Sequence, residues 1–306
     1  LQRLTGLDYK AKPGKWQRWW KSKGEAFVGP NDVAATGPRK IDPRYADGFV
    51  ERPYDTFKNV LVVVLTAPRD ELEKTLDKLK IKHTLTRGGE VSKCGLHPRA
   101  VFFANCPGNI DADDAERLDW FVRAGGSLFT TCIAVFNIVE RVFPGMMTGS
   151  KGQGEAGALD AEPVYETREF VTGVFHEQAR PRYQMAANQV IVPLRRERVR
   201  VVLDSVTATQ RWGAGDMAAF FRVGHGLVMD SANHFALQGM GRERLKTEDD
   251  RRAYALERLG LSFREVRKLD KKKVFRSHTK AAKACPDYTV MRLAARFVFA
   301  RQRLGF

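Results

Sequence analysis

The sequence has 306 residues, of which 43% are apolar, and this is enough for a packed core in a chain of about two average domains. The composition excludes a disordered or fibrous protein, and no apolar run approaches the roughly 18 residues that a membrane-spanning helix needs. Lysine and arginine (52) outnumber aspartate and glutamate (36), which gives a net charge of +16. Such an excess is typical of proteins that bind nucleic acid or another anionic partner, so its location matters.

The charge excess lies at the two ends of the chain. Residues 1–53 carry a net +5, residues 54–240 hold 22 basic and 22 acidic side chains, and residues 241–306 hold 19 basic and 8 acidic side chains. We therefore predict three parts: an N-terminal arm (1–53), an electrically neutral α/β domain (54–240), and a basic helical C-terminal extension (241–306) that packs on that domain or follows it.

The N-terminal arm begins with a tryptophan-rich segment. Trp16, Trp19 and Trp20 have the spacing that places three side chains on one side of a short helix. Basic residues lie between them, so the stripe could stack on bases, but packing against a neighbouring domain or protein is the favoured interpretation. A connector rich in proline and glycine follows, from 29 to 53. The chain starts at Leu1 and shows no signal-peptide pattern, which leaves the compartment open and favours the cytoplasm.

The neutral middle part alternates apolar strand patterns with helical ones. In chain order the predicted elements are a strand at 58–65, a helix at 69–80, strands at 81–86 and 100–104, a helix capped by Asp111, a strand at 127–131 and a helix at 133–142. Repeated units of this kind indicate a flavodoxin-like, doubly wound and mostly parallel sheet.

Further elements follow the glycine-rich stretch 145–157. Apolar runs predict strands at 189–194, 199–203 and 226–231, and helical periodicity predicts helices at 247–259 and 289–304. The last flank also contains a charge run that includes Lys271, Lys272 and Lys273. These three lysines could contact phosphates, or they could form an ordinary solvated surface.

Three segments in this order resemble the class I glutamine amidotransferase-like superfamily, over roughly residues 56–240. They are AVFFANCPG at 100–108, GGSLFTTC at 125–132 and GHGLVMDSANHFALQ at 224–238. Residues 129–145 and 233–238 more narrowly resemble a poorly characterised bacterial group of such domains, which often follows HEAT repeats. The resemblance therefore implies a protein partner or an upstream HEAT-repeat region.

The resemblance also implies a set of site residues. Cys132 would be the nucleophile at a strand-to-helix elbow, where a helix N-terminus lowers the pKa of a thiol, and His234 would be its base. Pro107, Gly108 and Asn109 would form the ligand pocket or oxyanion loop that donates backbone hydrogen bonds to the reacting oxygen.

The sequence departs from that catalytic pattern at several positions. Thr130 and Ala134 stand where the elbow calls for glycines, and Asn109 replaces the second glycine of the oxyanion turn. Ala236 replaces the glutamate that would orient the imidazole of His234. Most of the expected catalytic support is therefore missing.

The cysteines give no sign of a metal centre. Their positions, Cys94, Cys106, Cys132 and Cys285, have no C-x-x-C spacing and no nearby paired histidines, so we predict neither a metal site nor a cofactor.

Three functions fit these observations. We predict a non-catalytic scaffold or ligand-binding module whose basic flanks dock a partner. The first alternative is a cysteine-dependent amidase or hydrolase that uses Cys132 and His234, with Asp230 or Glu177 orienting the imidazole. The second is nonspecific binding of nucleic acid or another anionic partner through the flanks, which predicts a steep dependence on salt.

Overall fold

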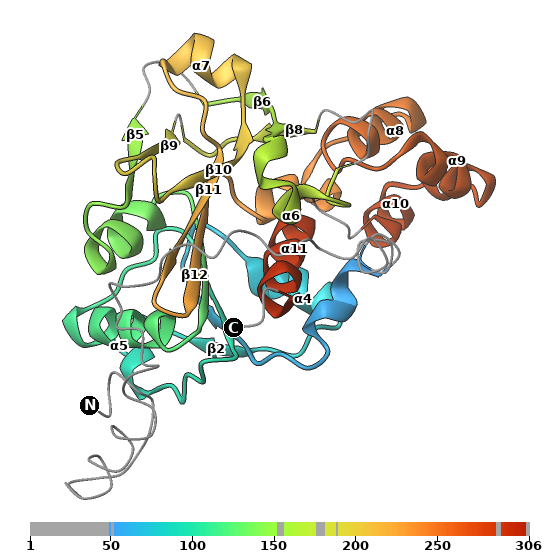
Figure 1. The fold of residues 1–306 in the computed structure, drawn as a ribbon. Coiled ribbons are helices and arrows are strands. Elements are labelled where there is room, and N and C mark those ends of the chain that lie inside the picture. The colour runs from blue at the N-terminus through green and yellow to red at the C-terminus, as the bar shows by residue number, and fades with distance from the viewer. Residues whose placement is uncertain are drawn as a thin grey trace, which may run out of the picture.

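The computed structural model describes residues 49, 52–151, 156–175, 181–187, 189–285 and 289–303. Its centre is an eight-stranded sheet with the strand order β2-β1-β3-β4-β12-β11-β10-β7 (Figure 1). The first five strands in this order run parallel, and the remaining neighbours pair antiparallel. The fold is therefore a mixed α/β fold with a large, mostly parallel central sheet.

The strands of the main sheet are short. The residues of the four neighbouring strands β1, β3, β4 and β12 are all buried. The bounds of the strands in this sheet are β1 (Val62–Leu65), β2 (Thr84–Thr86), β3 (Val101–Ala104), β4 (Ser127–Thr131), β7 (Glu162–Pro163), β10 (Arg200–Asp204), β11 (Ala218–Val223) and β12 (Gly226–Ser231). Two small antiparallel pairs lie outside it, formed by β5 (Met147–Lys151) with β9 (Gln189–Pro193) and by β6 (Ala158–Asp160) with β8 (Arg182–Gln184).

Helices connect the strands and continue after the last one. The longer ones are α4 (Leu72–Lys78), α5 (Ala112–Arg123), the π-helix η4 (Val135–Glu140), α6 (Arg168–Val171), α7 (Val206–Trp212), α8 (Glu248–Glu257), α9 (Phe263–Lys271), α10 (His278–Ala284) and α11 (Thr289–Arg303). Short 3-10 turns are η2 (Pro53–Phe57), η3 (Val91–Lys93), η5 (Tyr165–Thr167), η6 (Ala236–Gln238), η7 (Met240–Arg242) and η8 (Val274–Arg276).

Helices cover both faces of the sheet. Neighbouring residues of a strand point to opposite sides, so an apolar strand has side chains to bury on each face. On β3, the ring of Phe102 lies 6.4 Å from that of Phe121 in α5, whereas Phe103 faces the other side and lies 5.8 Å from Phe129 of β4. Phe129 in turn lies 5.7 Å from Phe297 of α11. The sheet is thus enclosed between α5 and α11.

Most predicted elements are confirmed. The apolar runs at 58–65, 100–104 and 127–131 contain β1, β3 and β4, and the side chain of Asp111 caps α5 by accepting a hydrogen bond from the amide of Asp114. Other assignments differ. The sequence-based prediction missed β5, β6, β7, β8, β11 and α7. The run at 189–194 forms β9 outside the main sheet, paired with β5 in the glycine-rich stretch.

Helix α11 belongs to the core, which changes the meaning of the charge in this region. Arg292, Arg296 and Arg301 are all at least nine-tenths buried. Arg296 donates from Nε to the backbone oxygen of Glu169 at 2.7 Å, and Arg301 donates to the backbone oxygens of Pro98 and Gly125. Part of the basic excess of residues 241–306 therefore holds the fold together and is unavailable to a partner.

The predicted tryptophan stripe lies outside the described residues, as do most of the other residues of the N-terminal arm. Within the part of the chain that is described, no helix combines the length and apolar character needed to cross a bilayer.

Candidate functional site

The elbow predicted at Cys132 is present. Cys132 directly follows β4 and has a backbone φ of +53°, a left-handed conformation that non-glycine residues rarely adopt. Its amide donates to the backbone oxygen of Ser231 at 2.8 Å, and its own backbone oxygen accepts from Gln189 Nε2 at 2.9 Å. Such a conformation needs support from its surroundings and is often found at functional sites.

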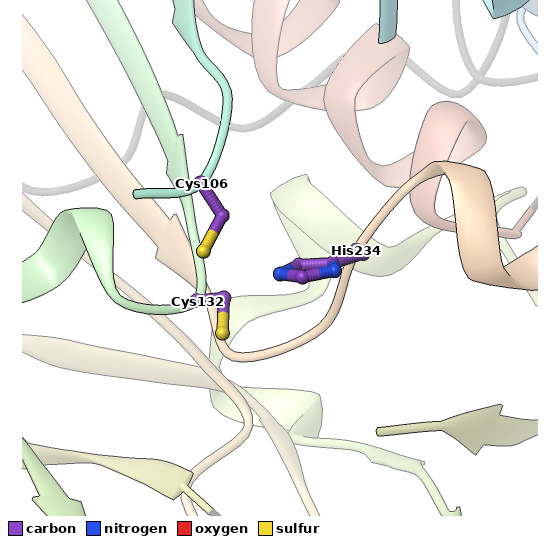
Figure 2. A group of neighbouring side chains, drawn as sticks. All are labelled: Cys106, Cys132 and His234. Atoms are coloured by element: carbon purple, nitrogen blue, oxygen red, sulfur yellow. The ribbon is translucent and has the colours of Figure 1, made fainter. Parts of the chain in front are cut away.

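Three parallel strands bring a cluster of side chains to the same edge of the sheet. Cys106 lies just beyond β3, Cys132 beyond β4 and His234 beyond β12, and these strands are direct neighbours. The two sulfur atoms and one imidazole nitrogen lie within 4.8 Å of one another. Figure 2 shows the imidazole pointing toward the two sulfurs. The structure thus joins the two predicted residues, Cys132 and His234, and adds Cys106, which was not predicted to belong to a site.

The cluster is closed to solvent. The exposed fraction is 0% for Cys106, 1% for Cys132 and 3% for His234. The Nε2 atom of His234 is buried and has no hydrogen-bond partner among the described residues. A buried polar atom of this kind carries a desolvation cost that usually signals a missing ligand or a functional role.

The pKa shifts oppose a nucleophilic role for Cys132. The hydrogen bond with Cys106 and burial raise the pKa of the Cys132 thiol. The hydrogen bond from Cys132, with the adjacent His234, lowers the pKa of Cys106 to about 5, although burial opposes this shift. Burial lowers the pKa of His234, but the contact with Cys106 and the charge of Asp70 outweigh it and leave the pKa raised. The shifts therefore make Cys106 the more acidic thiol of the pair.

Asp70 fixes the loop that carries His234, and the sequence-based prediction missed it. Its side chain is fully buried and accepts hydrogen bonds from the amides of Phe235 (3.1 Å) and Ala236 (3.0 Å) and from the hydroxyl of Thr131 (3.2 Å). One carboxylate thus connects the end of β4 to the His234 loop. Burial raises the pKa of Asp70, although His234 and the backbone donors lower it.

Asp230, one of the two candidates for orienting the imidazole, is hydrogen-bonded to Thr130 instead. The Oδ1 atom of Asp230 accepts from the Thr130 hydroxyl at 2.5 Å, and its Oδ2 atom has no partner among the described residues. Burial raises the pKa of Asp230 well above its usual value, so this side chain is a poor anion for holding an imidazolium. Glu177 lies outside the described residues.

The predicted oxyanion loop packs against the helix that follows Cys132. Asn137 of η4 donates from Nδ2 to the backbone oxygen of Pro107 at 2.7 Å and to Oδ1 of Asn109 at 3.1 Å. Gly108 has a φ of +69°, and a Cβ added there would lie 2.9 Å from atoms of Ala134 and Ile138. Glycine is therefore required at 108 by close packing as well as by backbone conformation.

The lysine run lies elsewhere. Lys271 ends α9, and Lys271, Lys272 and Lys273 are all exposed. The helices α8, α9 and α10 gather to one side of the sheet (Figure 1).

No family model and no curated protein matches the sequence. Among solved structures, a beta-galactosidase from Rahnella sp. R3 has a TM-score of 0.41 and 14% identity, over 57% of this chain and 28% of its own. A ThuA-like protein from Bacteroides uniformis has a TM-score of 0.40 and 11% identity, over 57% of this chain and 80% of its own. The carbohydrate deacetylase Agd3 has a TM-score of 0.43 and 9% identity, over 64% of this chain and 31% of its own.

These comparisons correct the resemblance drawn from the sequence. The structures that we compared are glycosidases, a carbohydrate deacetylase and a ThuA-like protein, together with a cytoplasmic protein from Salmonella typhimurium, and none is a glutamine amidotransferase. The predicted membership of the amidotransferase-like superfamily is therefore wrong, and the HEAT-repeat association that depended on it has no support. The chain spans less than a third of the length of the galactosidases, and the low similarity assigns it neither substrate nor activity.

Proposed function

We propose that the protein is a non-catalytic α/β module that binds a partner through the basic surface of its C-terminal helices. The burial of Cys132 supports the absence of catalysis. This residue is 1% exposed, and the pKa of its thiol is raised. A substrate cannot approach this sulfur, and the protonated thiol is a weak nucleophile. The order β2-β1-β3-β4-β12 supports a flavodoxin-like arrangement for the parallel half of the sheet.

Assays of hydrolysis test the absence of nucleophilic chemistry at Cys132. We expect glutamine and p-nitrophenyl acetate to be hydrolysed at the same background rate by the wild-type protein and by the Cys132→Ala variant. The matched control is Cys94→Ala, because Cys94 is half-buried and lies outside the cluster. A wild-type rate that falls at least about 100-fold in Cys132→Ala, but not in Cys94→Ala, would contradict the proposal.

The partner-binding half rests on the surface of α9 and α10. Nine basic side chains are exposed there: Arg264, Arg267, Lys268, Lys271, Lys272, Lys273, Arg276, Lys280 and Lys283. The acidic residues of the same stretch face other side chains, since Glu265 pairs with Arg292 and Asp270 with Arg252. Phe263, at the start of α9, is 63% exposed. A basic surface with an exposed aromatic ring favours a nucleic acid as the anionic partner.

Binding to single-stranded nucleic acid is therefore expected to depend steeply on salt. Each phosphate contact adds about 0.7 to the slope of log affinity against log salt for a single strand, so replacing Lys271, Lys272 and Lys273 by alanine should reduce the slope by about 2. Fluorescence anisotropy with a labelled oligonucleotide at several salt concentrations measures this change.

A second triple variant controls for the loss of charge alone. Lys80, Lys82 and Lys93 are also exposed but lie around β2, at an edge of the sheet. Their replacement by alanine should change the salt slope by no more than about 0.7, which is the contribution of one phosphate contact. Equal slopes for the two triple variants, or affinity that does not change with salt, would remove the nucleic-acid hypothesis.

A further inference from the structure

We propose that Cys106, Cys132 and His234 form a binding site for a zinc ion, held by two thiolates and one imidazole. Sequence spacing does not reveal such a site, because zinc motifs are recognised by short local spacings and these residues are far apart in the chain. The fold brings them together at the carboxyl ends of β3, β4 and β12.

The spacing of the three side chains suits a tetrahedral ion. With Zn–S bonds of about 2.3 Å and a Zn–N bond of about 2.0 Å, ligand atoms around zinc lie about 3.5 to 3.8 Å apart. The two sulfurs and the imidazole nitrogen already lie within 4.8 Å of one another. Changes of about 1 Å, within the range of side-chain rotation, bring them to binding distance.

The donor atoms also match in kind. Thiolate sulfur and imidazole nitrogen are the ligands that zinc prefers, whereas magnesium and calcium prefer oxygen. The buried Nε2 atom of His234, which has no partner among the described residues, would gain one in the ion. Zinc binding thus accounts for a polar atom that the described protein contacts leave unsatisfied.

The surroundings hold the site in place. The backbone of Cys132 is bonded to Ser231 and Gln189, and Asp70 ties the loop of His234 to Thr131 at the end of β4. Zinc ligands are usually oriented by such outer hydrogen bonds, and losing one typically lowers metal affinity about 10 to 100-fold.

The charges balance when the ion binds. The protons that the two thiols and the imidazole carry leave to solvent when the zinc ion binds, and the two thiolates neutralise its charge. No electron is transferred in this step. The two sulfurs and the imidazole nitrogen fill three of the four positions of a zinc tetrahedron.

Metal titration of the purified full chain under reducing conditions tests the site. We expect one equivalent of Zn²⁺ to bind in competition with a chromophoric chelator and to raise the melting temperature. One equivalent of Co²⁺ should give the sulfur-to-metal charge-transfer bands and the strong visible absorption of a tetrahedral thiolate site. Cys106→Ser, Cys132→Ser and His234→Asn should each lower the Zn²⁺ affinity more than about 100-fold, since they remove ligands themselves.

Matched substitutions outside the cluster serve as controls. Cys94→Ser and Cys285→Ser remove the other two thiols, and His83→Asn removes a half-buried imidazole. These variants should bind Zn²⁺ with wild-type affinity. Circular dichroism of every variant without metal separates loss of the site from loss of the fold, and the cobalt spectrum of the wild-type protein tests the thiolate ligands without any substitution.

Several results would overturn the proposal. One is the absence of stoichiometric Zn²⁺ binding by the reduced wild-type protein. Another is wild-type affinity in a Cys106→Ser/Cys132→Ser variant, which would place the ion elsewhere. A third is a Cys106–Cys132 disulfide under air combined with no metal binding after reduction, which would make the pair a redox couple. All of these readouts measure binding, so their failure is distinguishable from the hydrolysis test of the proposed function.

Discussion

Replacing Asp70 by alanine is expected to lower the free energy of unfolding by about 3 to 5 kcal/mol. The carboxylate accepts hydrogen bonds from two buried backbone amides, those of Phe235 and Ala236, and from the buried hydroxyl of Thr131. The substitution leaves these donors without a partner in a site that water does not reach, and each buried unsatisfied donor costs about 1 to 3 kcal/mol. Urea denaturation followed by fluorescence measures the change.

Two further variants separate the role of the hydrogen bonds from that of the charge. Asp70→Asn keeps one acceptor oxygen and most of the shape, so it should cost less than Asp70→Ala. Asp77→Ala removes a carboxylate that is 74% exposed and should change stability by no more than about 0.5 kcal/mol. If Asp70→Ala were as stable as Asp77→Ala, the carboxylate would not hold the loop of His234 in the way described.

Replacing Gly226 by alanine should lower the free energy of unfolding by about 2 to 4 kcal/mol. An added Cβ would overlap the backbone oxygen of Val122 in α5 and lie 2.5 Å from the backbone oxygen of Gly126. Both are backbone atoms, one in α5 and one directly before β4, so no side-chain rotation relieves the overlap. The same urea titration measures the effect.

Gly95→Ala is the matched control, because a Cβ at that position would have no atom within 4 Å. It should change stability by no more than about 0.5 kcal/mol, since a methyl group in open space only restricts the unfolded chain. A Gly226→Ala protein with the stability of Gly95→Ala would show that β12 and α5 can separate without cost.

The elements of the α/β fold were predictable wherever one local pattern decides the structure. Val62–Leu65 is an uninterrupted apolar run and forms a strand buried on both faces, and Thr247 and Asp250 form the capping box at the start of α8. Strand β11 was missed because Ala218–Val223 is a short run without alternation, and its pairing with β12 defines it. Strand β9 was predicted, but the sheet to which it belongs was not. Membership of a sheet depends on which strand pairs with β9, and that strand is β5.

The site was predictable only in part, for a similar reason. The elbow at Cys132 and the position of His234 follow from the order of strands, and both lie in the cluster. Cys106 and Asp70 belong to the same site because β1, β3, β4 and β12 end at one edge of the sheet, which is a property of the assembled fold. Asp70 is far from His234 in the sequence, so it carries no local signal of its role.

The position of α11 has a consequence for the order in which the protein can fold during synthesis. The helix covers β4 and β12, where Phe297 meets Phe129, yet its residues are translated long after β12 ends at Ser231. Until residues 289–303 have left the ribosome, that apolar face of the sheet lacks the cover that α11 provides. The nascent chain therefore exposes an aggregation-prone surface through the whole synthesis of α8, α9 and α10, when binding by a chaperone would be most useful.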